Sequence, residues 1–380
     1  MTDKQQLSNL IKAEALRLGF SACGIARAAA VDPHTAATLR AWLESRGNAD
    51  MDYMGNYMDK RLDPRLLMPE VKSIVCVALN YAPARRMPED EYQIAAYAYG
   101  KDYHDVMKAK LRELVARIEE RFSGSGKRGA GNEDGFSRSE ERGAGSEDGF
   151  SRSEEWGAGS EDTLYNNEAG TSHSPLLAPR SSFPAPHSSK TFPLSSVRIF
   201  VDTAPVLERY WAEQAGLGWI GRNRQLIIPH AGSMFVLGEV FLDIELAYDH
   251  PMENRCGNCH QCVDACPTKA LSVHPFNAAK CLSYQLIENR GELSEEAKAS
   301  MGNTIYGCDR CQLACPWNRF ARPTDEPAFL PSDELLSMTR EKWNSLTPDD
   351  YRRLFKGSAV KRAKYDGLMR NIKAQNKNER

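Results

Sequence analysis

Eight of the ten cysteines lie between Cys256 and Cys315, and their spacing is the strongest chemical signal in the chain. The first four form the pattern C-x2-C-x2-C-x3-C followed by proline, and they are Cys256, Cys259, Cys262 and Cys266. In bacterial sequences with this spacing, three thiolates bind one four-iron four-sulfur cluster and the fourth binds a neighbouring cluster. The spacing therefore predicts iron-sulfur chemistry, which stores and passes single electrons.

A second run, Cys308, Cys311 and Cys315 followed by Pro316, repeats the last three positions of the first. The position where a fourth cysteine would start this run is Ile305, and Cys281 is the only nearby substitute. The expected ligands of cluster 1 are Cys256, Cys259, Cys262 and Cys315. The expected ligands of cluster 2 are Cys266, Cys281, Cys308 and Cys311.

Structural zinc is the alternative, because paired CxxC units also build zinc ribbons. Zinc sites of that kind need two CxxC pairs separated by a loop. Here three cysteines fall within seven residues and a Cys-Pro follows three residues later. The pattern therefore favours two 4Fe-4S clusters over zinc.

A glycine motif at 216–221, GLGWIG, satisfies the G-x-G-x-x-G pattern of dinucleotide-binding proteins. That fingerprint must follow a strand and begin a helix. Here a helical pattern comes before it, and 222–229 reads as a strand. We therefore interpret the glycines as a turn that lets backbone approach a ligand or a neighbouring element.

Strand and helix patterns alternate on both sides of position 150. Apolar, β-branched runs predict strands at 71–81, 198–202 and 234–246, whereas 106–122 has helical spacing with Asp102 placed to cap it. A further helical pattern runs from Pro205 to Ala215. Such alternation predicts a mixed sheet covered by helices.

The segment 123–195 has a different character. It holds a tandem repeat with a fourteen-residue period that starts at Arg128, again at Arg142 and, as a partial copy, at Trp156. Each copy has too little apolar surface to bury, and the residues that follow are rich in Ser, Pro and His. We expect a disordered insertion in a surface loop.

Charge is nearly balanced overall, with 49 basic and 51 acidic residues among 380, but it is unevenly distributed. The last thirty residues hold 10 basic and 2 acidic side chains, which suggests a polyanionic partner. No run of consecutive apolar residues approaches the length of about 18 that a membrane span requires. The N-terminal residues have the pattern of a folded helix and lack that of a secretory signal. These features predict a cytoplasmic protein that does not bind membranes.

Several motifs together resemble the epoxyqueuosine reductase family. They are YAYGKDYH at 97–104, VDTAPVLER at 201–209, AGLGWIG at 215–221, the two cysteine runs and KYDGLMRNI at 364–372. The resemblance covers about 1–122 and 196–380, and the motifs occur in the same order as in the family. The repeat insertion has no counterpart in the family. It implies an enzyme that removes the epoxide oxygen of epoxyqueuosine at the wobble position of tRNAs with GUN anticodons, leaving queuosine.

The family uses cobalamin and two 4Fe-4S clusters, so the resemblance implies an α+β fold with three parts. We expect a mixed α/β cobalamin-binding catalytic domain over 1–248, interrupted at 123–195. A ferredoxin-like double-cluster domain at 249–325 and a short basic helical tail at 326–380 would follow. An external low-potential electron donor would supply the electrons, and we expect a monomer.

The resemblance also assigns residues. Asp202 matches the proton donor, and its position at the end of an apolar strand suggests that burial raises its pKa; a helix N-cap is the alternative role. Residues expected near cobalamin are Arg61, Tyr97, His104, Arg209, Gly218, Trp219 and Asn223. Residues expected to contact tRNA are Arg222, Arg352, Lys361 and Arg362. His104 lacks the glycine of the axial-histidine signature, because Met107 stands in its place, so we do not expect it to ligate cobalt.

Two other classes fit parts of the sequence. A reductive-dehalogenase-like corrinoid enzyme would share the pairing of a cobalamin domain with iron-sulfur clusters, but it is commonly exported with a twin-arginine signal and has no use for a basic tail. A non-catalytic electron carrier would require an N-terminal half that binds no cofactor. The absence of corrinoid absorbance after reconstitution would identify that class.

Overall fold

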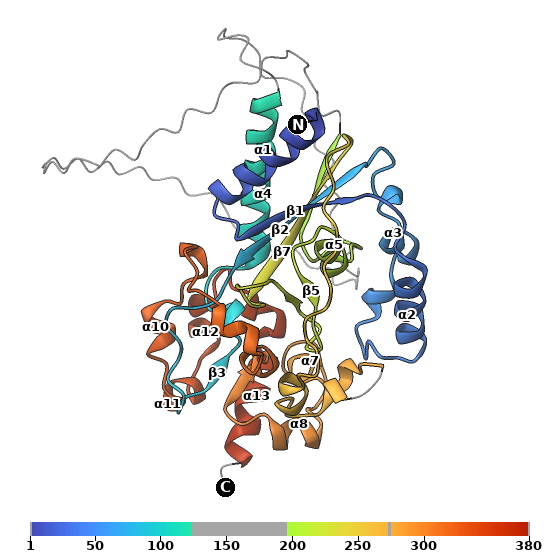
Figure 1. Cartoon of the computed structure of the whole chain (residues 1–380). Helices are drawn as coiled ribbons and strands as arrows, with labels where there is room; N and C mark the ends of the chain where they lie inside the picture. Colours follow the sequence, from blue (N-terminus) through green and yellow to red (C-terminus); the bar gives the residue numbers. More distant parts are fainter. Residues whose placement is uncertain (1, 123–195, 273–274, 379–380) are drawn as a thin grey trace, which may run out of the picture. The chain divides into compact units, whose positions relative to one another are not determined.

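The centre of the protein is a four-stranded sheet, seen in a computed structural model that describes residues 2–122, 196–272 and 275–378. The strand order is β1-β2-β7-β4, and every neighbouring pair is antiparallel (Figure 1). The strands are β1 (Ala22–Arg27), β2 (Ser73–Asn80), β7 (Phe235–Leu242) and β4 (Val197–Phe200). The predicted strands at 71–81, 198–202 and 234–246 are thus confirmed, with shorter bounds.

This sheet is antiparallel rather than mixed, which corrects the expectation from the alternating pattern. β1 and β7 run in one direction and β2 and β4 in the other, so hydrogen-bonded neighbours always run in opposite directions. The parallel pair in the described residues lies elsewhere and joins two short strands, β3 (Gln93–Ile94) and β8 (Thr304–Tyr306). That pair ties the N-terminal half to the segment that carries the second cysteine run.

Both faces of the sheet are covered, as the buried β2 strand shows. Val75, Val77 and Leu79 belong to one apolar core, whereas Ile74 and Cys76 belong to the other, as the two-residue period of a strand requires. Helices α1 (Asp3–Arg17) and α4 (Tyr103–Phe122) cover the first face, and α2 (Pro33–Glu44), α3 (Met58–Leu62) and α5 (Glu208–Gln214) contribute to the second.

Helix α4 begins where the sequence predicted. The Asp102 carboxylate accepts a hydrogen bond from the backbone N–H of His104 at 3.0 Å, which satisfies one of the free donors at a helix start. Met107, Leu111 and Ile118 are fully buried at helical spacing and bind α4 to the sheet. The cap therefore places Tyr103 and His104 at the carboxyl end of β4.

The glycine motif forms a β-hairpin of β5 (Trp219–Ile220) and β6 (Leu226–Ile227), not a nucleotide-binding turn. A Cβ on Gly218 would lie 2.0 Å from the Ile227 carbonyl oxygen, and Gly216 has φ +72°. Glycine is required because backbone packs directly against backbone. The interpretation of these glycines as a turn for close approach is confirmed.

The cysteine segment contains short helices joined by turns. They are α6 (Gln261–Asp264), α7 (Leu282–Ile287), α8 (Glu295–Ser300) and α9 (Arg310–Leu313). Helices α6 and α9 pack against each other, and each lies within one of the two cysteine runs. This packing brings the two runs together although about fifty residues separate them in the sequence.

The last part of the chain is not a tail that stands apart. It forms α10 (Asp333–Leu336), α11 (Arg340–Asn344), α12 (Pro348–Leu354) and α13 (Lys364–Asn378). Trp343 and Phe355 are buried in one core with Tyr92 and Tyr306. The described residues belong to one compact unit, while the predicted domain boundaries stay predictions. The predicted insertion, 123–195, lies outside the described residues.

None of the helices in the described residues combines the length and the apolar character that crossing a bilayer requires.

Candidate active site and cysteine groups

Asp202 lies in the turn between β4 and α5, where its backbone adopts the left-handed conformation with φ 53°. Its N–H donates to a carboxylate oxygen of Glu208, the first residue of α5. The residue at the N-cap of α5 is Leu207, which makes no side-chain cap. Asp202 therefore does not cap this helix, and its carboxylate is left for other partners.

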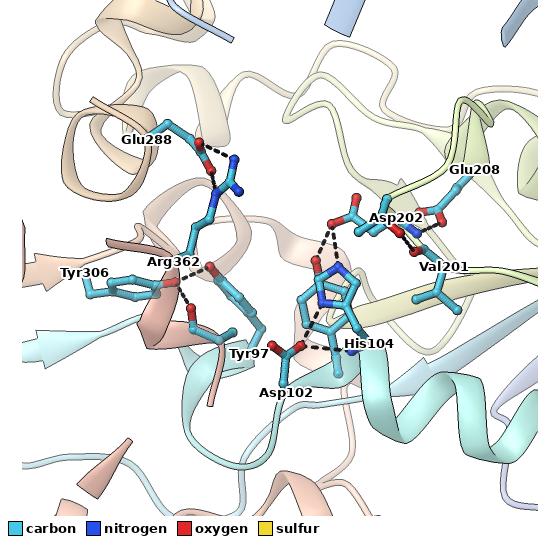
Figure 2. A network of polar contacts seen from close by, with 12 residues as sticks. Tyr97, Asp102, His104, Val201, Asp202, Glu208, Glu288, Tyr306 and Arg362 are labelled. Atoms are coloured by element: carbon cyan, nitrogen blue, oxygen red, sulfur yellow. Dashed lines mark hydrogen bonds and ion pairs between the residues drawn. The ribbon is translucent and has the colours of Figure 1, made fainter. Parts of the chain in front are cut away.

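Two residues at the start of α4 contact the Asp202 carboxylate (Figure 2). The Tyr103 hydroxyl donates to Oδ2, and His104 Nε2 lies 3.3 Å from the same oxygen. On its other side His104 Nδ1 lies 2.7 Å from Asp102 Oδ1. The Tyr103 and His104 rings stack with centroids 4.2 Å apart, so the histidine is held between two carboxylates.

The pKa of Asp202 corrects one expectation from the sequence. The Asp202 side chain is 55% exposed rather than buried. Desolvation favours its neutral form, but interactions with His104 and Tyr103 outweigh this and lower its pKa. The pKa is lowered because positive charge and hydrogen-bond donors stabilise the carboxylate. Asp202 is therefore ionised at neutral pH in the free protein.

The protonated group at this site is His104. Burial would lower its pKa, but its hydrogen bond to Asp102 and the negative charges of Asp202 and Asp102 raise the pKa to about 9. Glu208 also holds a proton more tightly than usual, because burial and the charge of Asp202 raise its pKa to about 8. At pH 7 two proton-bearing side chains thus contact Asp202, His104 at its carboxylate and Glu208 at its backbone N–H.

Tyr97 and Arg362 lie on the other side of this site (Figure 2). Tyr97 contacts the Tyr306 hydroxyl at 3.3 Å and packs edge-on against Tyr103. Arg362 donates two hydrogen bonds of 2.8 Å to Glu288 and lies over the Tyr53 ring. Burial and then the charge of Glu288 raise the pKa of Tyr53, with a contribution from Asp202, so these groups share one neighbourhood.

Four of the seven residues expected near cobalamin share an unusual property. The Nε of Arg61, the Nε1 of Trp219 and the Nδ2 of Asn223 are buried nitrogens without a hydrogen-bond partner among the described residues. His104 Nε2, which contacts Asp202 outside hydrogen-bonding geometry, has the same status. Buried donors are rarely left unpaired. Arg209 instead donates to the Arg224 carbonyl oxygen.

The cysteines of the first predicted group line one cavity of about 360 Å³. They are Cys256, Cys259, Cys262 and Cys315. The pKa of Cys262 is raised by burial and then by the other three thiols, which places all four in one neighbourhood. Trp317 and Phe320 form an aromatic wall of the same cavity, and Asn223 and His230 also line it.

The second predicted group, Cys266, Cys281, Cys308 and Cys311, is also gathered. The pKa of Cys311 is raised by burial first and then by Cys308, Cys281, Asp309 and Cys266. Cys266, Cys281 and Cys311 also pack in one apolar cluster. Among the described residues, no three His, Cys, Asp or Glu side chains surround one point as a single metal ion requires. The assignment of these groups to clusters stays a prediction.

The residues expected to contact tRNA lie in different surroundings. Arg352 pairs with Asp349, Arg362 pairs with Glu288, and Lys361 is exposed. Arg222 donates to the carbonyl oxygens of Gly257 and Cys259, so one role of its guanidinium is to support the first cysteine run. Part of the basic charge near the C-terminus is therefore neutralised within the protein.

The sequence pattern assigned no role at the site to Tyr103, Asp102 or Glu208. Asp102 and Tyr103 stand next to His104 in the DYH triplet, and Glu208 stands six residues after Asp202 in VDTAPVLER. Both motifs can be recognised in the sequence, but the contacts between them appear only in the folded structure. Nothing in the sequence shows that a turn brings the Glu208 carboxylate back to the Asp202 N–H.

Two family models match parts of the chain. One, described as "Epoxyqueuosine reductase QueG, DUF1730", matches residues 61–130. The other, described as a 4Fe-4S double cluster binding domain, matches residues 255–318. The second range contains all eight cysteines of the two groups.

Relatives of the whole chain carry the same name. An epoxyqueuosine reductase of Cellulophaga algicola is 37% identical over 98% of this chain and 99% of its own length. A crystal structure of epoxyqueuosine reductase with an epoxyqueuosine-modified tRNA-Tyr stem loop matches with a TM-score of 0.70 at 24% identity, over 97% and 80% of the two chains. One from Bacillus subtilis, with its catalytic aspartate loop swung out of the active site, matches with a TM-score of 0.68 at 23% identity, over 97% and 81%.

Proposed function

The chain belongs to the epoxyqueuosine reductase family and is an oxidoreductase, and from this premise we propose its reaction and its site. It reduces epoxyqueuosine at the wobble position of tRNAs with GUN anticodons, which yields queuosine. The epoxide accepts two electrons and two protons, the two C–O bonds break, and an alkene and water form. The observation that carries the proposal is the Asp202 carboxylate contacted by Tyr103 and His104.

Asp202 delivers a proton to the departing oxygen, and His104 supplies that proton. Because the pKa of Asp202 is lowered, its carboxylate is ionised and must first accept a proton from a neighbouring side chain. His104 Nε2 is 3.3 Å from Asp202 Oδ2, and Asp102 holds the histidine in its protonated form. General acid catalysis requires a donor within hydrogen-bond reach of its acceptor in the reacting complex, and this contact, which is long in the free protein, tightens when the substrate binds.

Cobalamin is the proposed cofactor beside these residues. The free N–H groups of Arg61, Trp219 and Asn223 fit it, because its amide-bearing rim offers many hydrogen-bond acceptors. When bound, it supplies a strongly reducing cobalt centre for C–O cleavage. Tyr97, His104, Arg209 and Gly218 complete the proposed contact set, in which the polypeptide orients the cofactor and excludes water.

The two cysteine groups fit two 4Fe-4S clusters, because each offers four thiols in one partly buried neighbourhood. Cys256, Cys259, Cys262 and Cys315 are the proposed ligands of cluster 1. Cys266, Cys281, Cys308 and Cys311 are those of cluster 2. The match of 255–318 to a double-cluster domain supports this assignment.

The proposed substrate is tRNA, and the relative solved with a modified stem loop supports that choice. Arg362 lies at the edge of the Asp202 site, and Lys361 is exposed next to it. Together with Arg352 and Arg222, these cations would meet RNA phosphates. We further propose a cytoplasmic monomer that takes electrons from an external low-potential donor.

The test is anaerobic. The protein is reconstituted with iron, sulfide and cobalamin and then reduced in the presence of epoxyqueuosine-containing tRNA, and the digested nucleosides are analysed by mass spectrometry. Queuosine that appears only with cobalamin supports the proposal. If about eight irons and one corrinoid bind per chain but no queuosine forms, the protein acts on another substrate.

A further inference from the structure

A second hollow lies beside the first cysteine group, on a surface that the proposed reaction does not use. Its volume is about 470 Å³, and Cys315 and Pro316 are among the residues that line it. Arg86, Arg319 and Arg322 also line it, and all three side chains are exposed. None of the described residues that line the hollow is an aspartate or a glutamate, so the lining carries a net positive charge.

The walls of this hollow are firmly built. Asn318 Nδ2 donates to the Gln312 carbonyl oxygen at 2.6 Å, and Asn318 Oδ1 accepts from the Ser233 N–H at 2.6 Å. On the other side the Asn80 side chain donates to the Arg322 carbonyl oxygen at 2.7 Å. Hydrogen bonds therefore hold the backbone that carries Arg319 and Arg322 in place, as a preformed recognition surface requires.

The hollow also exposes apolar surface. Leu313, in helix α9, is 53% exposed and lines the hollow together with Ala314 and Pro323. It is one of six large apolar side chains in the described residues that are exposed, at 45% to 54%. A small apolar centre surrounded by charges of one sign is typical of weak, electrostatically guided protein contacts.

We propose that this hollow, the donor-docking surface, is where a small acidic electron-carrier protein binds to reduce the enzyme. The inference rests on the proposed function, since it assumes that Cys315 ligates cluster 1. Arg86, Arg319 and Arg322 meet carboxylates of the carrier, and Leu313 meets its apolar centre. Each encounter oxidises the carrier by one electron and reduces the cluster by one, without a change in any covalent bond.

A protein fits this surface better than RNA does. The tyrosine rings of Tyr81, Tyr97 and Tyr103 follow one another with centroid distances of 6.4 and 6.0 Å. Tyr103 contacts Asp202 at one end, while Tyr81 at the other end bonds to Gln312, the residue before Leu313. The hollow is thus separated from the proposed site of the modified base. An exposed leucine also offers nothing to a phosphate backbone.

The test uses the reconstituted holoenzyme and the double variant Arg86→Glu/Arg322→Glu. Arg319 is left in place because it also lines the cavity of the first cysteine group. The probes are an acidic flavodoxin and an acidic ferredoxin, each labelled and oxidised for anisotropy titrations and reduced for stopped-flow bleaching of the cluster absorbance. Reduced methyl viologen, a small cation, serves as a donor that needs no docking. The control variant is Arg27→Glu/Arg40→Glu, which changes the same charge at exposed positions in β1 and α2.

We expect the double variant to bind a carrier at least about tenfold more weakly at low ionic strength and the difference to shrink in high salt. Arg86→Gln/Arg322→Gln should show a smaller loss, and the control variant none. Reduction by methyl viologen and affinity for the tRNA stem loop should not fall. Unchanged carrier affinity in the double variant, or no binding of either carrier to the unmodified protein, would overturn the proposal.

A loss of tRNA affinity in the double variant would overturn it as well and identify the hollow as an RNA surface. Failure of the proposed function gives a different result. In that case the unmodified protein, reduced by methyl viologen, would not convert epoxyqueuosine, whatever the carrier titrations show.

Discussion

Asp202 occupies a backbone conformation that few residues adopt, with φ 53°. Asn tolerates this region nearly as well as Asp and has the same shape. Asp202→Asn should therefore fold and keep the contact with Glu208 through its backbone N–H, but its amide cannot act as an acid. We expect turnover to fall by roughly 10²- to 10⁴-fold, measured as queuosine released by digestion. Cluster and cobalamin absorbance should be unchanged, and normal turnover would remove Asp202 from the role of acid.

His104 gives the activity a predictable dependence on pH. Its pKa is raised from 6.5 to about 9 in the folded protein. The stability that its proton contributes is therefore fully present below pH 6.5, and both the proton and this stability are lost as the pH rises through about 9. Turnover should fall over the same range. In Asp102→Asn one cause of the raised pKa is removed, so the fall should move to lower pH. A pH profile that is identical in both proteins would contradict this role.

Of the eight cysteines predicted to bind clusters, Cys281 has the least support from spacing, because it belongs to neither cysteine run. It lies before α7 and packs with Cys266 and Cys311. In Cys281→Ala the iron content after reconstitution should fall from about eight toward about four per chain, because one cluster loses a ligand. The control is Cys76→Ala, at a fully buried thiol in β2, which should keep its iron. Equal iron content in both variants would reject Cys281 as a ligand.

At the scale of the elements, the β5–β6 hairpin has no room for a Cβ atom at Gly218. A Cβ at Gly218 would meet the Ile227 carbonyl oxygen at 2.0 Å, and neither backbone can move without shifting Trp219 and Asn223. Gly218→Ala should lower the free energy of unfolding by roughly 1 to 3 kcal/mol, the usual cost of overpacking, and should weaken cobalamin binding. Denaturant unfolding and cobalamin titration measure the two effects. Gly55→Ala, where a Cβ meets nothing within 4 Å, should be neutral in both.

The elements differ in how far the sequence predicts them. Strand β2 and helix α4 were predictable because their apolar residues repeat with one period and are buried. Helices α10, α11 and α12 are short. Burial of Trp343 and Phe355 against residues far away in the chain holds them in place, which no local pattern reveals. The cysteine groups were readable from spacing alone. The Tyr103–Asp202 contact was not, because it joins residues 99 positions apart.

At the scale of the whole molecule, the segment 123–195 is a long connection between α4, which ends at Phe122, and β4, which begins at Val197. Deletion of 126–192 removes it while keeping every described element. Because loop-closure entropy changes slowly with length, the shorter connection should stabilise the fold by at most on the order of 2 kcal/mol. The thermal midpoint should be unchanged or slightly raised, and turnover of epoxyqueuosine-containing tRNA should be unchanged. A lower midpoint would show that the segment supports the fold. Lost turnover with an unchanged midpoint would instead give it a part in recognising the substrate.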